Sequence, residues 1–94
     1  MTIEQDPYEE MRRKPLRILN KHAERRVEDN ASLEVVLEAM RYGDISPEGR
    51  GKYRAVLPVK DGKLLVVIFR DWGEYLILLT VTLTGGSRRW RPWG

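Results

Sequence analysis

His22 is the only imidazole in the chain, and therefore the only side chain that ordinarily gains and loses a proton near neutral pH. Arg26 follows four residues later, a spacing that puts both side chains on one face of a helix. Metal-independent RNA cleavage needs a base for the ribose 2′-hydroxyl and cations that stabilise charge on the phosphate. With Arg50 or Arg54 reaching the phosphate, these residues form a candidate set for that chemistry.

Each of these side chains also has a purely structural interpretation. His22 follows the expected helix cap Asn20, where the helix N-terminus favours the neutral imidazole and a role as base. It can equally be a structural histidine that donates to a backbone carbonyl. Arg26 can pair with Glu28 or Asp29 instead of a phosphate. The residue types alone leave both interpretations open.

Composition excludes several other kinds of chemistry. The chain has no cysteine, which excludes disulfides, thiolate zinc sites and a cysteine nucleophile, and one histidine excludes a multi-histidine metal site. A glycine-rich phosphate loop and paired catalytic carboxylates are also missing from the sequence. We therefore expect no metal and no cofactor. The length of 94 residues fits one small domain.

Charge is distributed unevenly along the chain. The net charge is only +3, but the cations gather in blocks at 12–26, 50–63 and 88–91 that acidic segments separate. If the blocks converge, they form a surface that follows a phosphate backbone; otherwise they are solvated faces. The predicted nucleic-acid contacts are Lys21, Arg25, Arg50, Lys52, Arg88, Arg89, Trp90 and Arg91.

Aromatic residues accompany the cations in two places. The tail 85–94 combines arginines with two tryptophans, which suits contacts to single-stranded or ribosomal RNA and equally a dimer or antitoxin contact. Trp72 and Tyr75 flank an expected turn. They can stack bases, but aromatics beside turns commonly pack over a sheet edge, and we expect packing.

Residues that commonly begin or end helices divide the first half of the sequence into mainly helical segments. Asp6 as the N-cap and Pro7 as the first helical residue predict a helical arm that stops at Lys14, before a proline. Residues 16–19 fit a short strand or the opening of a long helix, and we expect the strand because Asn20 is a good cap for a helix that begins at Lys21. A helix from Lys21 to about Asp29 and a second one from Ser32 to Gly43 follow, the last glycine in the left-handed conformation. The expected buried positions of these helices are Ala23, Val27, Leu33, Val36, Leu37 and Met40.

The second half has the period of strands. Residues 44–51 are rich in glycine, proline and polar residues and predict an exposed loop. Alternation predicts a strand over 52–59, and Asp61-Gly62 predicts a hairpin turn. Two apolar runs, 64–69 and 75–84, complete a three-stranded meander that strand 16–19 joins. With the helix pair on one face, the fold class is α+β.

Residues 16–84 resemble a family of small bacterial and archaeal domains of unknown function that is commonly grouped with RelE/ParE-like toxins. The resemblance rests on a helix with His22, Ala23 and Arg26, a second helix closing at Gly43, and a meander ending in Thr80 and Val81. It implies two helices packed on a small antiparallel sheet. It also implies a toxin-type endoribonuclease or RNA-binding toxin that acts on RNA or the ribosome and is held by an antitoxin protein.

The resemblance carries over His22, Arg26 and Thr80 as site residues, and with Arg54 they make the predicted catalytic set. The alternative function is a non-catalytic module, which can be a homodimer, that binds nucleic acid or protein. The expected organisation is a helical arm at 1–15, the α+β domain and a basic aromatic tail at 85–94. With no signal-like or membrane-spanning segment in the sequence, we expect a cytoplasmic protein.

Overall fold

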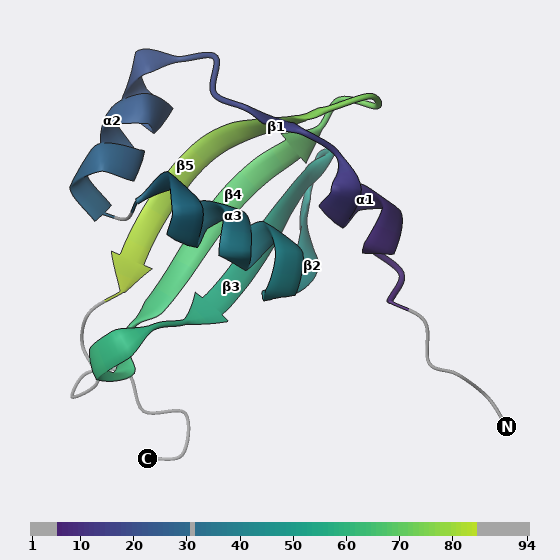
Figure 1. The fold of residues 1–94 in the computed structure, drawn as a ribbon. Coiled ribbons are helices and arrows are strands. Elements are labelled where there is room, and N and C mark those ends of the chain that lie inside the picture. Colours follow the sequence, from purple (N-terminus) through teal and green to yellow (C-terminus); the bar gives the residue numbers. More distant parts are fainter. Residues whose placement is uncertain (1–5, 31, 85–94) are drawn as a thin grey trace, which may run out of the picture.

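The computed structural model describes residues 6–30 and 32–84, and at residues 22, 26 and 28–30 it describes the backbone only. The three α-helices lie on one side of a single sheet (Figure 1). The helices are α1 (Glu9–Arg13), α2 (Lys21–Asn30), α3 (Leu33–Tyr42) and the short 3₁₀ turn η1 (Lys60–Gly62). The strands are β1 (Leu16–Arg17), β2 (Asp44–Gly49), β3 (Lys52–Pro58), β4 (Leu64–Asp71) and β5 (Leu76–Thr84).

The sheet has five strands in the order β1-β5-β4-β3-β2. Strands β2 to β5 form an antiparallel meander, and β1 lies parallel to β5, with Leu16 opposite Leu76. The predicted α+β class is therefore confirmed. The expectation of an antiparallel sheet with three meander strands is wrong in two respects, because the sheet is mixed and the meander has a fourth strand.

The extra strand is β2, in the segment predicted to be an exposed loop. Ile45 is buried opposite Ala55, and this single apolar anchor fixes the segment against β3. Pro47 is compatible with β2 because the strand lies at the sheet edge, where one side of the backbone needs no ladder bond. The glycine and proline content that indicated a loop instead reflects an edge strand that turns tightly into β3.

The caps of the two long helices are those the sequence predicts. The Ala23 N–H donates to Asn20 Oδ1 at 2.6 Å, and the Val35 N–H donates to Ser32 Oγ at 3.3 Å. Ala23 and Val27 are buried where α2 packs on β5, as expected. These caps set where each helix begins, and so which residues face the sheet.

The buried stripe of α3 differs from the predicted one. Val36, Ala39 and Met40 are buried against β3 and β4, whereas Leu33 and Leu37 are 48% and 41% exposed. The expected stripe of Leu33, Val36, Leu37 and Met40 is therefore only half right. Val36, Ala39 and Met40 also follow the i, i+3, i+4 spacing of one helix face. The small Ala39 side chain lets this face of α3 lie close to the sheet.

Gly43 ends α3 without the left-handed conformation that the sequence predicts. Its φ of −71° and ψ of 169° are open to any residue. Space is what requires glycine, because a Cβ here would lie 2.4 Å from the Ala39 carbonyl oxygen and 2.9 Å from that of Val56. The glycine therefore lets the chain pass directly from α3 into β2.

The N-terminal arm is tied to the domain. Helix α1 begins at Glu9 rather than at the predicted Pro7. The Asp6 carboxylate accepts the Tyr8 N–H and pairs with Arg12. The Arg12 guanidinium also donates to the carbonyl oxygens of Met40 and Arg41, each at 3.2 Å, at the C-terminal end of α3.

No described helix is long and apolar enough to cross a membrane.

Candidate nucleic-acid interface

The sheet face opposite the helices is the candidate site, and we call it the open face. Side chains alternate between the two faces of a strand. Because Ala55, Val67 and Phe69 are buried on the helical side, their neighbours in sequence point to the other side. The pairing register places the following residues of β3, β4 and β5 on the open face: Lys52, Arg54, Val56, Val66, Ile68, Arg70, Ile77 and Thr80.

Cations line up across one end of the open face. Arg17 of β1 is opposite Ile77, Ile77 is opposite Arg70, and Arg70 is opposite Lys52. We call Arg17, Arg70 and Lys52, together with Arg54 in the adjacent row, the cationic row. Because neighbouring strands lie about 5 Å apart, these four side chains span roughly 15 Å of the sheet.

Few acidic groups neutralise the cationic row. Within the described part of the chain, Arg17, Lys52 and Arg70 take part in no ion pair, and Arg54 pairs with Glu48 at 3.7 Å while its side chain stays 47% exposed. Lys52 and Arg70 are direct cross-strand partners, an arrangement in which like charges destabilise a sheet. An anion bound between them would remove this repulsion.

A turn beside the row holds Arg70 in place. The Arg70 Nη1 donates to the carbonyl oxygen of Arg50 at 3.3 Å. Arg50 itself has a φ of 56°, which a residue with a side chain rarely adopts, between two glycines that also have positive φ. The tight β2–β3 turn thus brings a further cation to the same end of the sheet.

A β-bulge determines the position of Thr80. Ile68 pairs with Thr80 and Phe69 pairs with Leu78, so the register shifts by one residue at Leu79. Strict alternation from the buried Leu78 would turn Thr80 toward the helices. The bulge reverses this, so that Thr80 lies on the open face and Val81 is buried.

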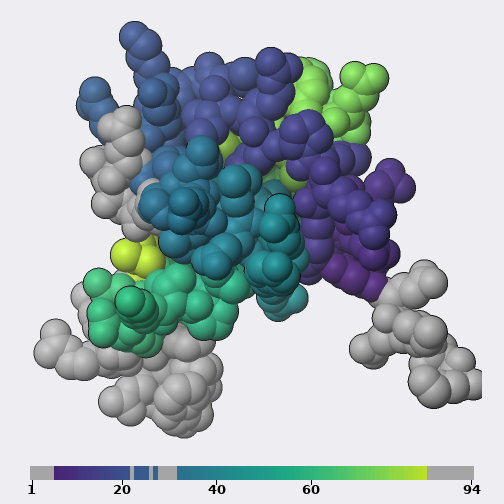
Figure 2. All heavy atoms as spheres, viewed as in Figure 1, coloured from purple at the N-terminus to yellow at the C-terminus, as the bar shows by residue number. Residues whose placement is uncertain are grey.

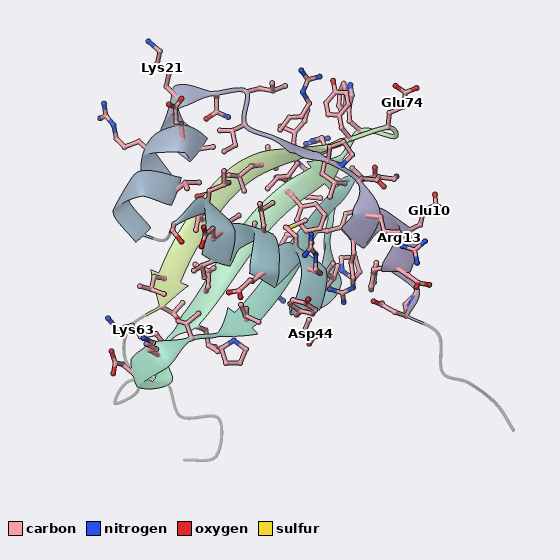
Figure 3. The ribbon with its side chains drawn as sticks, in the orientation of Figure 1. Glu10, Arg13, Lys21, Asp44, Lys63 and Glu74 are labelled. Carbon is pink, nitrogen blue, oxygen red and sulfur yellow. The ribbon has the colours of Figure 1, made fainter. Side chains whose placement is uncertain are left out.

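The structure brings only some of the predicted site residues together. Arg50, Lys52 and Arg54 lie at one end of the sheet, and Thr80 shares the open face at about 10 Å from Arg54, two strands away. Lys21 and Arg25 are exposed on α2, on the helical side, and Lys21 points outward from it (Figure 3). The predicted contacts Arg88, Arg89, Trp90 and Arg91 lie outside the described residues.

Helix α2 also carries His22 and Arg26, whose side chains lie outside the description. The helix packs on the face of β5 that holds Leu76 and Leu78, opposite the open face. The predicted catalytic set is therefore divided. His22 and Arg26 belong to a helix on one side of the sheet, whereas Arg54 and Thr80 are strand residues of the opposite face.

Arg17 and Arg70 are members of the row that the sequence analysis did not select. Arg17 belongs to the first basic block, but β1 is too short to reveal its face. Arg70 directly follows an apolar run and is two residues after Ile68. Because side chains alternate along a strand, this spacing could have placed Arg70 on the same face of the sheet as Ile68. What the sequence lacks is the cross-strand register that sets Arg70 beside Lys52.

On the helical side, where α1 and α3 lie next to each other (Figure 2), residues of both helices line a groove. Its volume is about 1150 Å³, with an apolar floor that includes Leu37 and Met40. Its rim mixes acids and bases that pair with one another, such as Glu9 with Arg13 at 3.0 Å. The lining holds four cations, but Arg12, Arg13 and Lys14 are each paired with a carboxylate, and Arg41 is the one without an ion pair among the described residues. The groove therefore attracts a polyanion less than the cationic row does.

The hairpin next to the cationic row is anchored by an ion pair. Lys14 Nζ lies 3.0 Å from Asp71 Oδ1, which also accepts the Gly73 N–H at 2.9 Å. Burial alone would raise the pKa of the Asp71 carboxyl, but the Gly73 N–H and the Lys14 ammonium hold this pKa below its ordinary value of 3.8. The pair joins the end of the arm to the β4–β5 hairpin.

This pair makes stability depend on pH. Because the pKa of Asp71 is lower in the folded chain, its contribution is present above the unfolded value and lost as pH falls through the folded value. We expect the difference in free energy of unfolding between the native chain and Asp71→Asn to shrink from about pH 6 to about pH 3. Urea denaturation measures it, with the exposed Glu10→Gln as control. A difference that stays constant with pH would contradict this role of the pair.

Comparison of the chain with protein-family models, with curated proteins and with solved structures finds no match. In the described part of the chain, no group of three histidine, cysteine, aspartate or glutamate side chains can hold a metal ion. The function must therefore be inferred from the open face itself.

Proposed function

We propose that this chain is an RNA-binding protein of the RelE-like toxin type, and that it binds RNA on the open face of its sheet. The observation that carries the proposal is the cationic row, in which Lys52 and Arg70 are direct cross-strand neighbours without an acidic partner among the described side chains. Phosphates bound along this row would supply the missing negative charge.

The arrangement of elements supports the toxin type. A strand, two helices and an antiparallel meander follow one another, which is the order that the resemblance implies. Both Thr80 and Arg54, which the sequence analysis placed in the site, belong to the open face. The ribosome as target and an antitoxin as partner remain predictions of that resemblance.

Binding, rather than cleavage, is what the open face supports best. Arg17, Arg70, Lys52 and Arg54 carry the guanidinium and ammonium groups that bind phosphates. The predicted base, His22, comes from α2 on the other side of the sheet. Endoribonuclease activity therefore stays a prediction that the binding experiment also tests.

The test is the affinity of the full chain for a labelled single-stranded RNA of about ten nucleotides, measured by fluorescence anisotropy at several salt concentrations. With four cations in contact, we expect log K to fall with log salt at a slope of about −3. The absence of binding at about 0.05 M salt would contradict the proposal. Gel analysis of the same RNA shows whether it is cut, and loss of cutting in His22→Ala and Arg26→Ala with folding intact would support the predicted catalytic set.

A further inference from the structure

An exposed tryptophan stands beside the cationic row. Trp72 occupies the β4–β5 turn and is 59% exposed, although the sequence analysis expected it to pack over the sheet edge. Arg70 is on the open face, and Asp71 pairs with Lys14 on the helical side. Because side chains alternate, Trp72 lies on the same side of the sheet as Arg70. A large apolar ring thus lies in solvent next to Arg70, which forms no ion pair with the described side chains.

The turn that presents the indole is held in place on both sides. The Trp72 N–H donates to the Tyr75 carbonyl oxygen at 2.9 Å, and the Gly73 N–H donates to Asp71. Gly73 has a φ of 106°, which permits the tight reversal. A short, hydrogen-bonded turn loses little conformational entropy when a ligand stacks on it.

The second aromatic of the turn joins it to the cations. The guanidinium carbon of Arg17 lies 4.9 Å from the centroid of the Tyr75 ring, a cation–π distance. Trp72 directly follows β4 and is two residues from Arg70, which is about 7 Å along an extended chain. An aromatic face and phosphate-binding side chains are therefore within the span of adjacent nucleotides.

We infer that Trp72 is a base-stacking site and that the RNA bound on the open face is single-stranded. This inference rests on the proposed function. An unpaired base offers its ring face to the indole while its phosphates lie on Arg70 and Lys52. Bases inside an A-form duplex are stacked on each other and offer no free face to a side chain at the tip of a hairpin.

The experiment uses the full chain with Trp90→Phe and Trp93→Phe, so that Trp72 is the only remaining tryptophan of three. Its fluorescence is followed during titration with a single-stranded oligouridylate, with a duplex RNA of equal length and with inorganic polyphosphate. We expect quenching by the oligouridylate alone. In the same background, isothermal titration calorimetry, which needs no tryptophan, should show that Trp72→Ala weakens oligouridylate binding about tenfold and polyphosphate binding less than twofold, while Trp72→Phe keeps most of the affinity.

Equal quenching by polyphosphate, or full oligouridylate affinity in Trp72→Ala, would overturn the stacking site. A variant with Lys52→Gln, Arg54→Gln and Arg70→Gln separates the two proposals. If this variant loses RNA while Trp72→Ala does not, the RNA-binding face stands and the stacking site fails. If it keeps its RNA affinity, the proposed function fails.

Discussion

Replacing Lys52, Arg54 and Arg70 together by glutamine should lower the affinity for single-stranded RNA about 100-fold at about 0.1 M salt. Each cation that meets a phosphate contributes roughly 1 kcal/mol under these conditions, and about 3 kcal/mol corresponds to a factor of about 100. The salt dependence should change as well, with the slope of log K against log salt falling by about 2 in magnitude. Fluorescence anisotropy at several salt concentrations measures both effects.

The matched control removes the same charge elsewhere. Arg13 and Lys63 project from α1 and from the end of the β3–β4 turn, away from the cationic row (Figure 3), and Lys60 is exposed in the same turn. Their joint replacement by glutamine should change affinity less than threefold at about 0.1 M salt. Equal losses in both triple variants would show that binding follows net charge rather than the open face.

Replacing Phe69 by alanine should lower the free energy of unfolding by about 3–5 kcal/mol. The Phe69 ring is fully buried on the helical side of β4 and stacks on Tyr53, with 5.8 Å between the ring centroids. Tyr53 in turn meets Tyr8, at the start of the arm, edge to face at 6.0 Å. Its removal leaves a cavity between the sheet and the arm, directly beneath Ile68 and Arg70 of the open face.

Urea denaturation measures this loss, and Phe69→Leu provides the graded comparison. Leucine fills most of the ring volume, so its effect should be clearly smaller than that of alanine. A loss below about 1 kcal/mol for Phe69→Ala would contradict the placement of this ring at the centre of the core.

Local signals in the sequence were sufficient for much of the fold. Asn20 and Ser32 cap the helices as predicted, and the turn at Asp61 and Gly62 has the positive φ values that the Asp-Gly pair indicates. Strand β2 was not predicted, because it is defined by its pairing with β3 and not by a pattern in its own residues. Ile45 gives the segment its only buried apolar anchor, and it is recognisable only opposite Ala55.

The open face shows the same limit. Its cations come from β1, β3 and β4, and only pairing register brings Arg17, Arg70 and Lys52 into one row. The β5 bulge had a readable signal, because the consecutive leucines at 78 and 79 break the alternation that the threonines at 80, 82 and 84 resume. That break predicts a bulge, and a bulge at this point puts Thr80 on the side of the sheet away from the helices.

The most direct test of the open face is an NMR titration of the ¹⁵N-labelled chain with a single-stranded RNA of about ten nucleotides at low salt, where binding is strongest. We expect amide shift changes concentrated at Arg17, Lys52, Arg54, Arg70 and Trp72, with α3 nearly unchanged. Changes concentrated on α2 and α3, with these five amides unmoved, would contradict RNA binding on the open face.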